Sequence, residues 1–200
     1  AQPLSPTWRW LLSIIVATID VQLGRPTAAL ASIDAALQLP QVDQDDRLRQ
    51  NLLRQRAMAL YEQGQTAEAL ALALSSHRYL ADYYATGVTG FSAAQLALML
   101  ALQGRVDEAT TYVAQARAVF HQLDALPALA GLQVIEVYGQ FMRGQTDRAR
   151  VAVSSVLRRL QEAEGPAPDL RLWLLLSLVL GESGEHQRAL ALAQETAQQM

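Results

Sequence analysis

Gly144-Gln-Thr-Asp-Arg-Ala149-Arg150 is one of five copies of a short stretch in which an alanine follows a glycine after five residues. Successive glycines lie 40 residues apart, so the pattern covers the whole 200-residue chain. Self-similarity at a fixed period of this length is typical of a solenoid built from one repeated supersecondary unit. The five pairs are Gly24 and Ala29, Gly64 and Ala69, Gly104 and Ala109, Gly144 and Ala149, and Gly184 and Ala189.

Each unit divides at its glycine into a strongly apolar segment and a more charged segment. Glycine adopts the left-handed conformation that commonly ends a helix, and the small alanine lets the following helix approach closely. The pattern therefore predicts an all-α chain of five antiparallel helix hairpins, or about ten helices. The expected helices are 8–23, 26–39, 47–63, 66–84, 92–103, 106–123, 128–143, 146–164, 170–183 and 186–199.

Helix-breaking residues separate the units. We expect breaks at Pro40, at Gly87 and Gly90, at Pro127 and at 165–168, with Asp45 or Asp46 as an N-cap. The prediction is one repeat domain over 1–200 with units 1–45, 46–85, 86–126, 127–165 and 166–200.

Composition excludes several kinds of chemistry. The chain has no cysteine and its sixteen basic residues are all arginine, so thiolate and Schiff-base chemistry are excluded. The net charge of -3 offers neither the basic face that binds nucleic acid nor the one that binds an anionic membrane. The apolar segment 11–19 is interrupted by Asp20 and Gln22, which favours a buried repeat helix over a membrane span.

No set of acids, bases or nucleophiles points to catalysis. His77, His121 and His186 are far apart in the sequence, so they do not have metal-ligand spacing. The acidic run 43–46 lacks the glycine and final glutamate of a calcium loop. We predict a protein that is not an enzyme and that uses no metal or cofactor.

A helix that ends in glycine, followed five residues later by alanine, resembles the tetratricopeptide repeat. The small residue expected seven positions before the glycine is present as Ala17, Ala57, Ala97 and Ser177, and is replaced by Val137 in the fourth unit. The family period is 34 residues, whereas this one is 40. Lengthened units of this kind resemble the effector-binding domain of MalT-type, LuxR-family transcription activators. The resemblance implies a right-handed α-α superhelix.

In tetratricopeptide arrays the first helix of each unit lines the concave face. Carried over to this chain, the groove positions lie ten, six, three and two residues before each glycine. They are Ile14, Thr18, Val21 and Gln22, then Arg54, Met58, Tyr61 and Glu62, then Ala94, Leu98, Ala101 and Leu102, then Val134, Tyr138, Phe141 and Met142, and finally Leu174, Leu178, Gly181 and Glu182.

This lining is mostly apolar and has two interpretations. It either binds an apolar ligand or a partner's apolar helix, or it is buried by a tightly wound superhelix. We favour the second interpretation for the lining as a whole. The best local candidates for binding are Tyr61, Tyr138, Phe141 and Met142, because aromatic residues and methionine form adaptable binding surfaces.

The first and last helices look uncovered. The segment 8–16 is apolar nearly all round, and a helix of that kind expects cover on both sides. We therefore expect either a piece of a longer protein or ends that pair with another copy.

The resemblance implies a noncatalytic module that binds a protein, a peptide or a small apolar effector. It would be the cytoplasmic sensor domain of a bacterial transcription regulator, with no direct contact to nucleic acid or membrane. The alternative is a constitutive protein-protein interaction scaffold without a small ligand.

Overall fold

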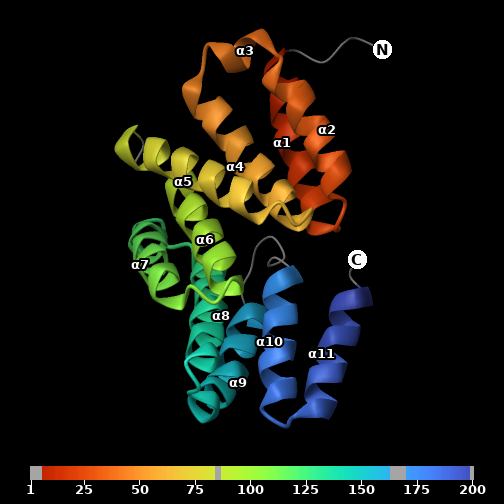
Figure 1. Cartoon of the computed structure of the whole chain (residues 1–200), viewed down its shortest axis with the longest axis vertical. Coiled ribbons are helices and arrows are strands. Elements are labelled where there is room, and N and C mark those ends of the chain that lie inside the picture. Colours follow the sequence, from red (N-terminus) through yellow and green to blue (C-terminus); the bar gives the residue numbers. More distant parts are fainter. Residues whose placement is uncertain (1–5, 84–86, 163–169, 199–200) are drawn as a thin grey trace. The chain divides into compact units, whose positions relative to one another are not determined.

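The computed structural model describes residues 6–83, 87–162 and 170–198, and these residues form helices and no strand (Figure 1). Eleven helices occupy the described part of the chain. Their bounds are α1 Pro6–Gln22, α2 Pro26–Leu37, α3 Pro40–Asp43, α4 Asp46–Glu62, α5 Thr66–Tyr83, α6 Gly87–Leu102, α7 Val106–Gln122, α8 Leu126–Met142, α9 Thr146–Glu162, α10 Leu170–Glu182 and α11 His186–Gln198.

The chain divides into two compact units. Unit 1 comprises residues 1–96 and unit 2 comprises residues 97–200, so the division falls within α6. In unit 1, α1 pairs with α2 and α4 pairs with α5. In unit 2, α8 pairs with α9 and α10 pairs with α11, each pair forming an antiparallel hairpin (Figure 1). The predicted all-α hairpin architecture is confirmed.

The repeated glycine ends the first helix of every hairpin in the left-handed conformation. The φ angles of Gly24, Gly64, Gly104, Gly144 and Gly184 lie between 65° and 86°. At Gly144, the glycine N–H donates to the Phe141 carbonyl at 2.8 Å and the Gln145 N–H donates to the Gln140 carbonyl at 3.0 Å. This pair of bonds is a Schellman motif, and the same pair recurs at the other four glycines.

The alanine five residues after the glycine lies in the first turns of the second helix. Its N–H donates to the carbonyl of the residue after the glycine, as from Ala149 to Gln145 at 3.0 Å. The alanines of the first four hairpins are at most 2% exposed. In the last hairpin, a Cβ built on Gly181 would lie 3.7 Å from the Ala189 Cβ, so the two helices approach closely there. The small side chain permits this approach.

A sixth turn repeats the same geometry without glycine. Asp124, between α7 and α8, has a φ of 51°, and the Ala125 N–H donates to the Phe120 carbonyl at 2.9 Å. Aspartate tolerates the left-handed conformation better than most residues do. The sequence predicted a break here at Pro127, but Pro127 lies in the first turn of α8, where its missing N–H breaks no helical hydrogen bond.

Several expected helix boundaries differ from those of the structure, and the differences at α6 and α2 change the description of the fold. α6 begins at Gly87 and continues through Gly90, whereas we expected it to begin at residue 92. The second helix of the first hairpin ends at Leu37, and the short helix α3 follows from Pro40. The expected break at 165–168 lies outside the described residues. The prediction of an N-cap is confirmed at Asp45, whose Oδ1 accepts from the Leu48 N–H at 3.1 Å.

The core of unit 1 explains the extra helix. Pro40 cannot continue α2, because proline lacks the N–H and clashes with the preceding turn. The chain instead turns into α3 and inserts Val42, which is fully buried, into a cluster with Ile33 and Leu52. The second helices of the next three hairpins, α5, α7 and α9, are longer than α2. Each buries an apolar side chain sixteen residues after its glycine, namely Leu80, Phe120 and Leu160.

Polar contacts join three of the second helices, α2, α7 and α9, to the hairpin that follows. In unit 1, Arg56 Nε donates to Asp34 Oδ1 at 3.2 Å, and Gln63 donates to Thr27 at 3.2 Å. In unit 2, Arg117 pairs with Glu136, Arg143 with Asp107, and Arg150 with Glu185. The contacts on the second helices fall three, six, ten and thirteen residues after the glycine. These positions therefore face the next hairpin.

Candidate functional site

The predicted groove residues of unit 1 carry a polar network. Thr18 Oγ1 donates to the Ile14 carbonyl at 2.8 Å and accepts from Gln55 Nε2 at 2.7 Å, which links α1 to α4. On α4, the Arg54 guanidinium donates through Nε and Nη2 to Asn51 Oδ1, at 3.1 and 2.9 Å. Gln55 is 4% exposed, so its bond to the partly exposed Thr18 satisfies a buried amide.

Arg54 is the one arginine of the described residues whose pKa is markedly lowered. Burial lowers its pKa to about 10, because desolvation penalises the charged guanidinium. At neutral pH the side chain is still charged, so its partial burial costs stability. The amide of Asn51 compensates for part of this cost. A carboxylate brought by a ligand would compensate for more of it, because it would add charge-assisted hydrogen bonds.

We expect Arg54→Met to stabilise the protein. Methionine keeps much of the buried stem and removes the desolvated charge, so the free energy of unfolding should rise by about 1 kcal/mol. Urea denaturation followed by circular dichroism measures this change. Arg49→Met, at an exposed position of the same helix, is the control and should change the stability by less than about 0.5 kcal/mol. If Arg54→Met lowered the free energy of unfolding instead, the contacts of the arginine side chain would stabilise the protein by more than its desolvation costs.

The predicted groove residues differ widely in exposure. Among the site residues, Met58, Leu98, Val134 and Tyr138 are buried, at 0–6% exposure. Arg54, Tyr61 and Phe141 are partly exposed. The exposed site residues are Glu62, Leu102, Met142, Leu174 and Leu178. Of the other lining positions, Val21 and Ala101 are buried, Ile14, Thr18, Ala94 and Gly181 are partly exposed, and Glu182 is exposed. The side chain of Gln22 lies outside the described ones.

Exposure follows the place of each residue in the repeat. Ten and six residues before the glycine, Val134 and Tyr138 of α8 are buried, whereas Leu174 and Leu178 of α10 are 47% and 44% exposed. α10 packs against α8. These positions in α8 therefore belong to the face that a following hairpin covers, and in α10 no following hairpin is present in the described chain. The interpretation as packing residues accounts for this part of the lining.

Two residues before the glycine, the side chains of α6 and α8 stay accessible in unit 2. Leu102 is 36% exposed and Met142 is 44% exposed. Phe141 is partly exposed and rests on the buried ring of Tyr138, with the ring centroids 6.4 Å apart. The Met142 methyl group lies 4.0 Å from a Cβ built on Gly104, two residues after Leu102. We call Leu102, Phe141 and Met142 the apolar surface of unit 2.

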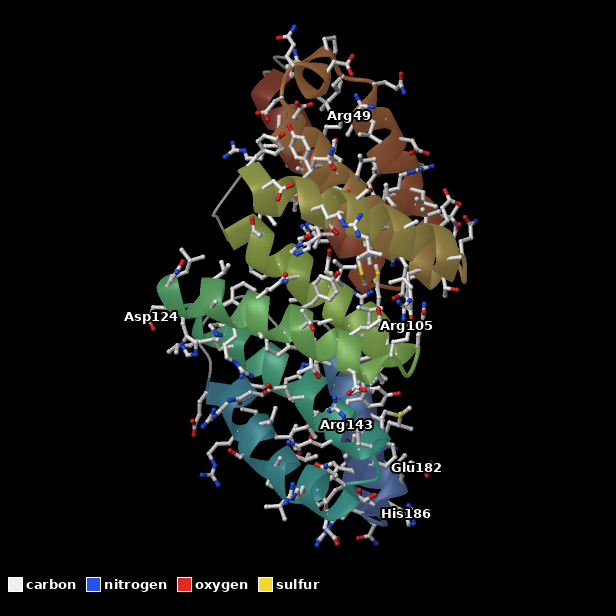
Figure 2. The ribbon with its side chains drawn as sticks, turned by 60° about the vertical axis from the view of Figure 1, so that its left-hand side comes forward. Arg49, Arg105, Asp124, Arg143, Glu182 and His186 are labelled. Atoms are coloured by element: carbon white, nitrogen blue, oxygen red, sulfur yellow. The ribbon has the colours of Figure 1, made fainter. Side chains whose placement is uncertain are left out.

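The turns of unit 2 carry the charged residues beside this surface. Figure 2 shows Arg105 and His186 at one edge of unit 2, Arg143 further in from that edge, and Asp124 at the opposite edge. Arg143 donates to Asp107 Oδ1 at 2.7 Å and to Thr110 Oγ1 at 3.2 Å. Arg105 binds Glu108 through two hydrogen bonds of 2.7 Å. The Glu108 carboxylate raises the pKa of Arg105, and Arg105 lowers the pKa of Glu108.

The histidines are dispersed as the sequence indicated. His77 is buried, whereas His121 and His186 are exposed. In the described part of the chain, no three histidine, cysteine or acidic side chains come together as metal ligands would. Among the same residues, no helix is long and apolar enough to span a membrane.

Sequence reasoning missed the partners of the polar network. Asn51 and Gln55 lie on no predicted groove position, but Gln55 stands where the first, fourth and fifth units have Ile15, Ile135 and Leu175. A glutamine in an apolar register was the available signal.

Comparison with known proteins identifies the fold. No protein-family model matches the chain, and no curated protein matches it. Among solved structures, it superposes on a Rap protein complexed with Competence and Sporulation Factor with a TM-score of 0.77 at 13% sequence identity. That match covers 98% of this chain and 56% of the Rap chain. The chain thus spans little more than half of the Rap chain's length.

A second solved structure agrees. The chain superposes with a TM-score of 0.62 on nearly identical TPR-like repeats of a putative kinesin light chain from Podospora anserina. The identity is 18%, and the match covers 98% of this chain and 96% of that chain. The chain has a TPR-like repeat fold. At these identities the likeness extends to the fold alone.

Proposed function

We propose that the chain is a noncatalytic binding module that holds an apolar segment of a protein or peptide partner on the first helices of its hairpins. The apolar surface of unit 2 is the observation that supports this function. Leu102 and Met142 are accessible at matching positions of two successive first helices, and Phe141 beside Met142 is partly exposed. Aromatic and methionine side chains of this kind anchor helices and peptides.

The fold likeness supports the same class of function. The Rap protein was solved with Competence and Sporulation Factor bound, so a chain of this fold can accommodate a ligand. The polar network of unit 1 adds a second type of contact. Arg54 would donate to a carboxylate or a backbone carbonyl of the partner, since in the described part of the chain its guanidinium donates to an amide oxygen on α4 and to no carboxylate.

In the cell, the module would act as the cytoplasmic sensor domain of a bacterial transcription regulator, as in MalT-type activators of the LuxR family. Binding would favour one arrangement of the hairpins over another, which is a shift in population. Contact with DNA would then lie in another domain. The apolar surface would equally accept a small apolar effector.

A constitutive scaffold is the second candidate. The polar contacts between hairpins favour it, because pairs such as Arg143 with Asp107 hold successive hairpins in one arrangement. Small-angle scattering with and without a bound peptide separates the two candidates. A change in the radius of gyration on binding supports the sensor, whereas an unchanged curve supports the scaffold.

Selection of peptides tests the binding function directly. A random peptide library displayed on phage is panned against the chain, and a selected peptide is then labelled for fluorescence anisotropy. We expect the double variant Leu102→Ser, Met142→Ser to weaken binding about tenfold or more, as loss of interface anchors does.

The matched control is the double variant Leu126→Ser, Val151→Ser, which replaces side chains that are 62% and 70% exposed elsewhere in unit 2. It should bind the peptide as the natural sequence does. Equal affinity of all three proteins, or a library that yields no binder, would contradict the proposed surface.

A further inference from the structure

A stripe of apolar residues on α1 is open to solvent. Leu12, Ile15, Val16 and Ile19 are 39–47% exposed. They follow one another at three- and four-residue intervals, so they share one face of the helix. None of the four is charged or polar, which makes the stripe unusual for the surface of a soluble domain.

The other repeats show what covers this face. Four repeats later, α10 has Leu172, Leu175, Leu176 and Val179 at the same four positions, and all are at most 8% exposed. The helix that precedes α10 in the fold is α9, and the two are in contact. In α8, Leu132 and Ile135 occupy the first two positions and are buried, and α8 packs against α7. In α4, Leu52 at the first position lies in a buried cluster with Ile33 of α2, and Arg56 at the third position pairs with Asp34 of α2. The stripe on α1 is therefore the face that the second helix of a preceding hairpin covers.

The last hairpin offers the matching open face. Leu174 and Leu178 of α10 are exposed at positions that are buried in α8, where the next hairpin follows. On α11, Leu190 is 59% exposed. Leu190 lies six residues after Gly184, the register in which Arg150 and Thr110 contact the next hairpin. We call the face of a second helix that contacts the next hairpin its forward face. In the described chain, no hairpin packs on the forward face of α11.

The α1 stripe and the forward face of α11 are alike in carrying no charged residue at the positions where other hairpins form ion pairs. Where α4 and α8 carry Arg56 and Glu136, the preceding helix supplies the opposite charge through Asp34 and Arg117. α1 has Val16 at this position, which needs no partner charge. The forward face of α11 is likewise uncharged, since the positions three, six, ten and thirteen residues after its glycine are Gln187, Leu190, Gln194 and Ala197.

We propose that a second copy of this chain covers the α1 stripe with its last hairpin, so that the fifth repeat of one copy is followed by the first repeat of the next. The contact is head-to-tail and uses different surfaces on the two copies. It continues the packing that successive hairpins already make within each unit. Contacts of this type build open chains or closed rings.

Two single variants test the proposal on the whole 200-residue chain. Val16→Arg blocks the α1 stripe and Leu190→Arg blocks the forward face of α11. We expect the natural sequence to associate at about 100 µM in sedimentation velocity, and each variant to raise the dissociation constant by about 30-fold or more. Both side chains are exposed in the single chain, so the helical circular dichroism of the variants should be unchanged.

An equimolar mixture of the two variants is the decisive arm. Val16→Arg keeps an intact last hairpin and Leu190→Arg keeps an intact α1, so the mixture should form one dimer and nothing larger. Val151→Arg, at an exposed position of α9, is the control and should associate like the natural sequence.

Three results would overturn the proposal. The first is a natural chain that stays monomeric at that concentration, which would leave the stripe for another occupant such as a helix of a longer polypeptide. The second is loss of association in Val16→Arg but not in Leu190→Arg, which would show pairing of α1 with α1. The third is a mixture that stays monomeric.

Discussion

Phe120→Ala should lower the free energy of unfolding by about 3–5 kcal/mol, the cost of removing a large core aromatic and leaving a cavity. Phe120 is 1% exposed and has the largest of the fully buried side chains among the described residues. It lies near the end of α7, and its carbonyl accepts the Ala125 N–H of the following turn. Loss of packing here therefore affects both the helix and the Asp124 turn. Urea denaturation monitored by circular dichroism measures the change.

The repeat itself provides the matched variant. Leu80 and Leu160 occupy the same position in α5 and α9, and both are buried. Phe120→Leu keeps an apolar side chain that neighbouring repeats accept, so it should cost about 1–1.5 kcal/mol. Leu123→Ala, three residues later and 54% exposed, should cost less than about 0.5 kcal/mol. If Phe120→Ala lowered the free energy of unfolding no more than Leu123→Ala does, the result would contradict the burial of Phe120 at the end of α7.

Ala149→Leu should destabilise the protein by about 3 kcal/mol, at the upper end of what overpacking costs. Ala149 is fully buried in the first turns of α9, and α9 packs against α8. A leucine at this position has no space unless the two helices move apart. Thermal and urea unfolding should both show the loss.

Ser155→Leu is the control for this variant. Ser155 is exposed on the same helix, and leucine is a better helix former than serine. The control should therefore change stability by less than about 0.5 kcal/mol. An Ala149→Leu variant as stable as the natural protein would mean that the alanine of the repeat signature has no packing role.

Most of the fold could be predicted from local chemistry. A left-handed residue ends a helix, and glycine adopts that conformation at the least cost, so Gly144 and its counterparts marked the turns correctly. The start of α6 could not be predicted in this way. Gly87 and Gly90 suggested a break, but packing stabilises a helix that includes both glycines despite their low helix propensity.

The candidate site was less predictable because exposure depends on neighbours. The family register placed Val134 and Leu174 at equivalent positions, yet Val134 is buried and Leu174 is 47% exposed. The sequence shows only the register, whereas burial depends on whether a further hairpin packs on that face. The sequence also indicated that the apolar first helix lacks cover, but only the structure shows that Leu12, Ile15, Val16 and Ile19 form the exposed stripe.

The sequence by itself determined where each hairpin turns and which alanine lies beneath the turn, because these features depend on backbone conformation and side-chain size within a few residues. Only the tertiary structure decided which apolar residues are accessible. Leu102 and Met142 became a candidate binding surface, and Val16 and Leu190 became candidate contacts between copies, because their side chains are exposed in the described structure. Burial is a property of packed helices, and identical positions in a repeat can differ in it whenever their neighbours differ.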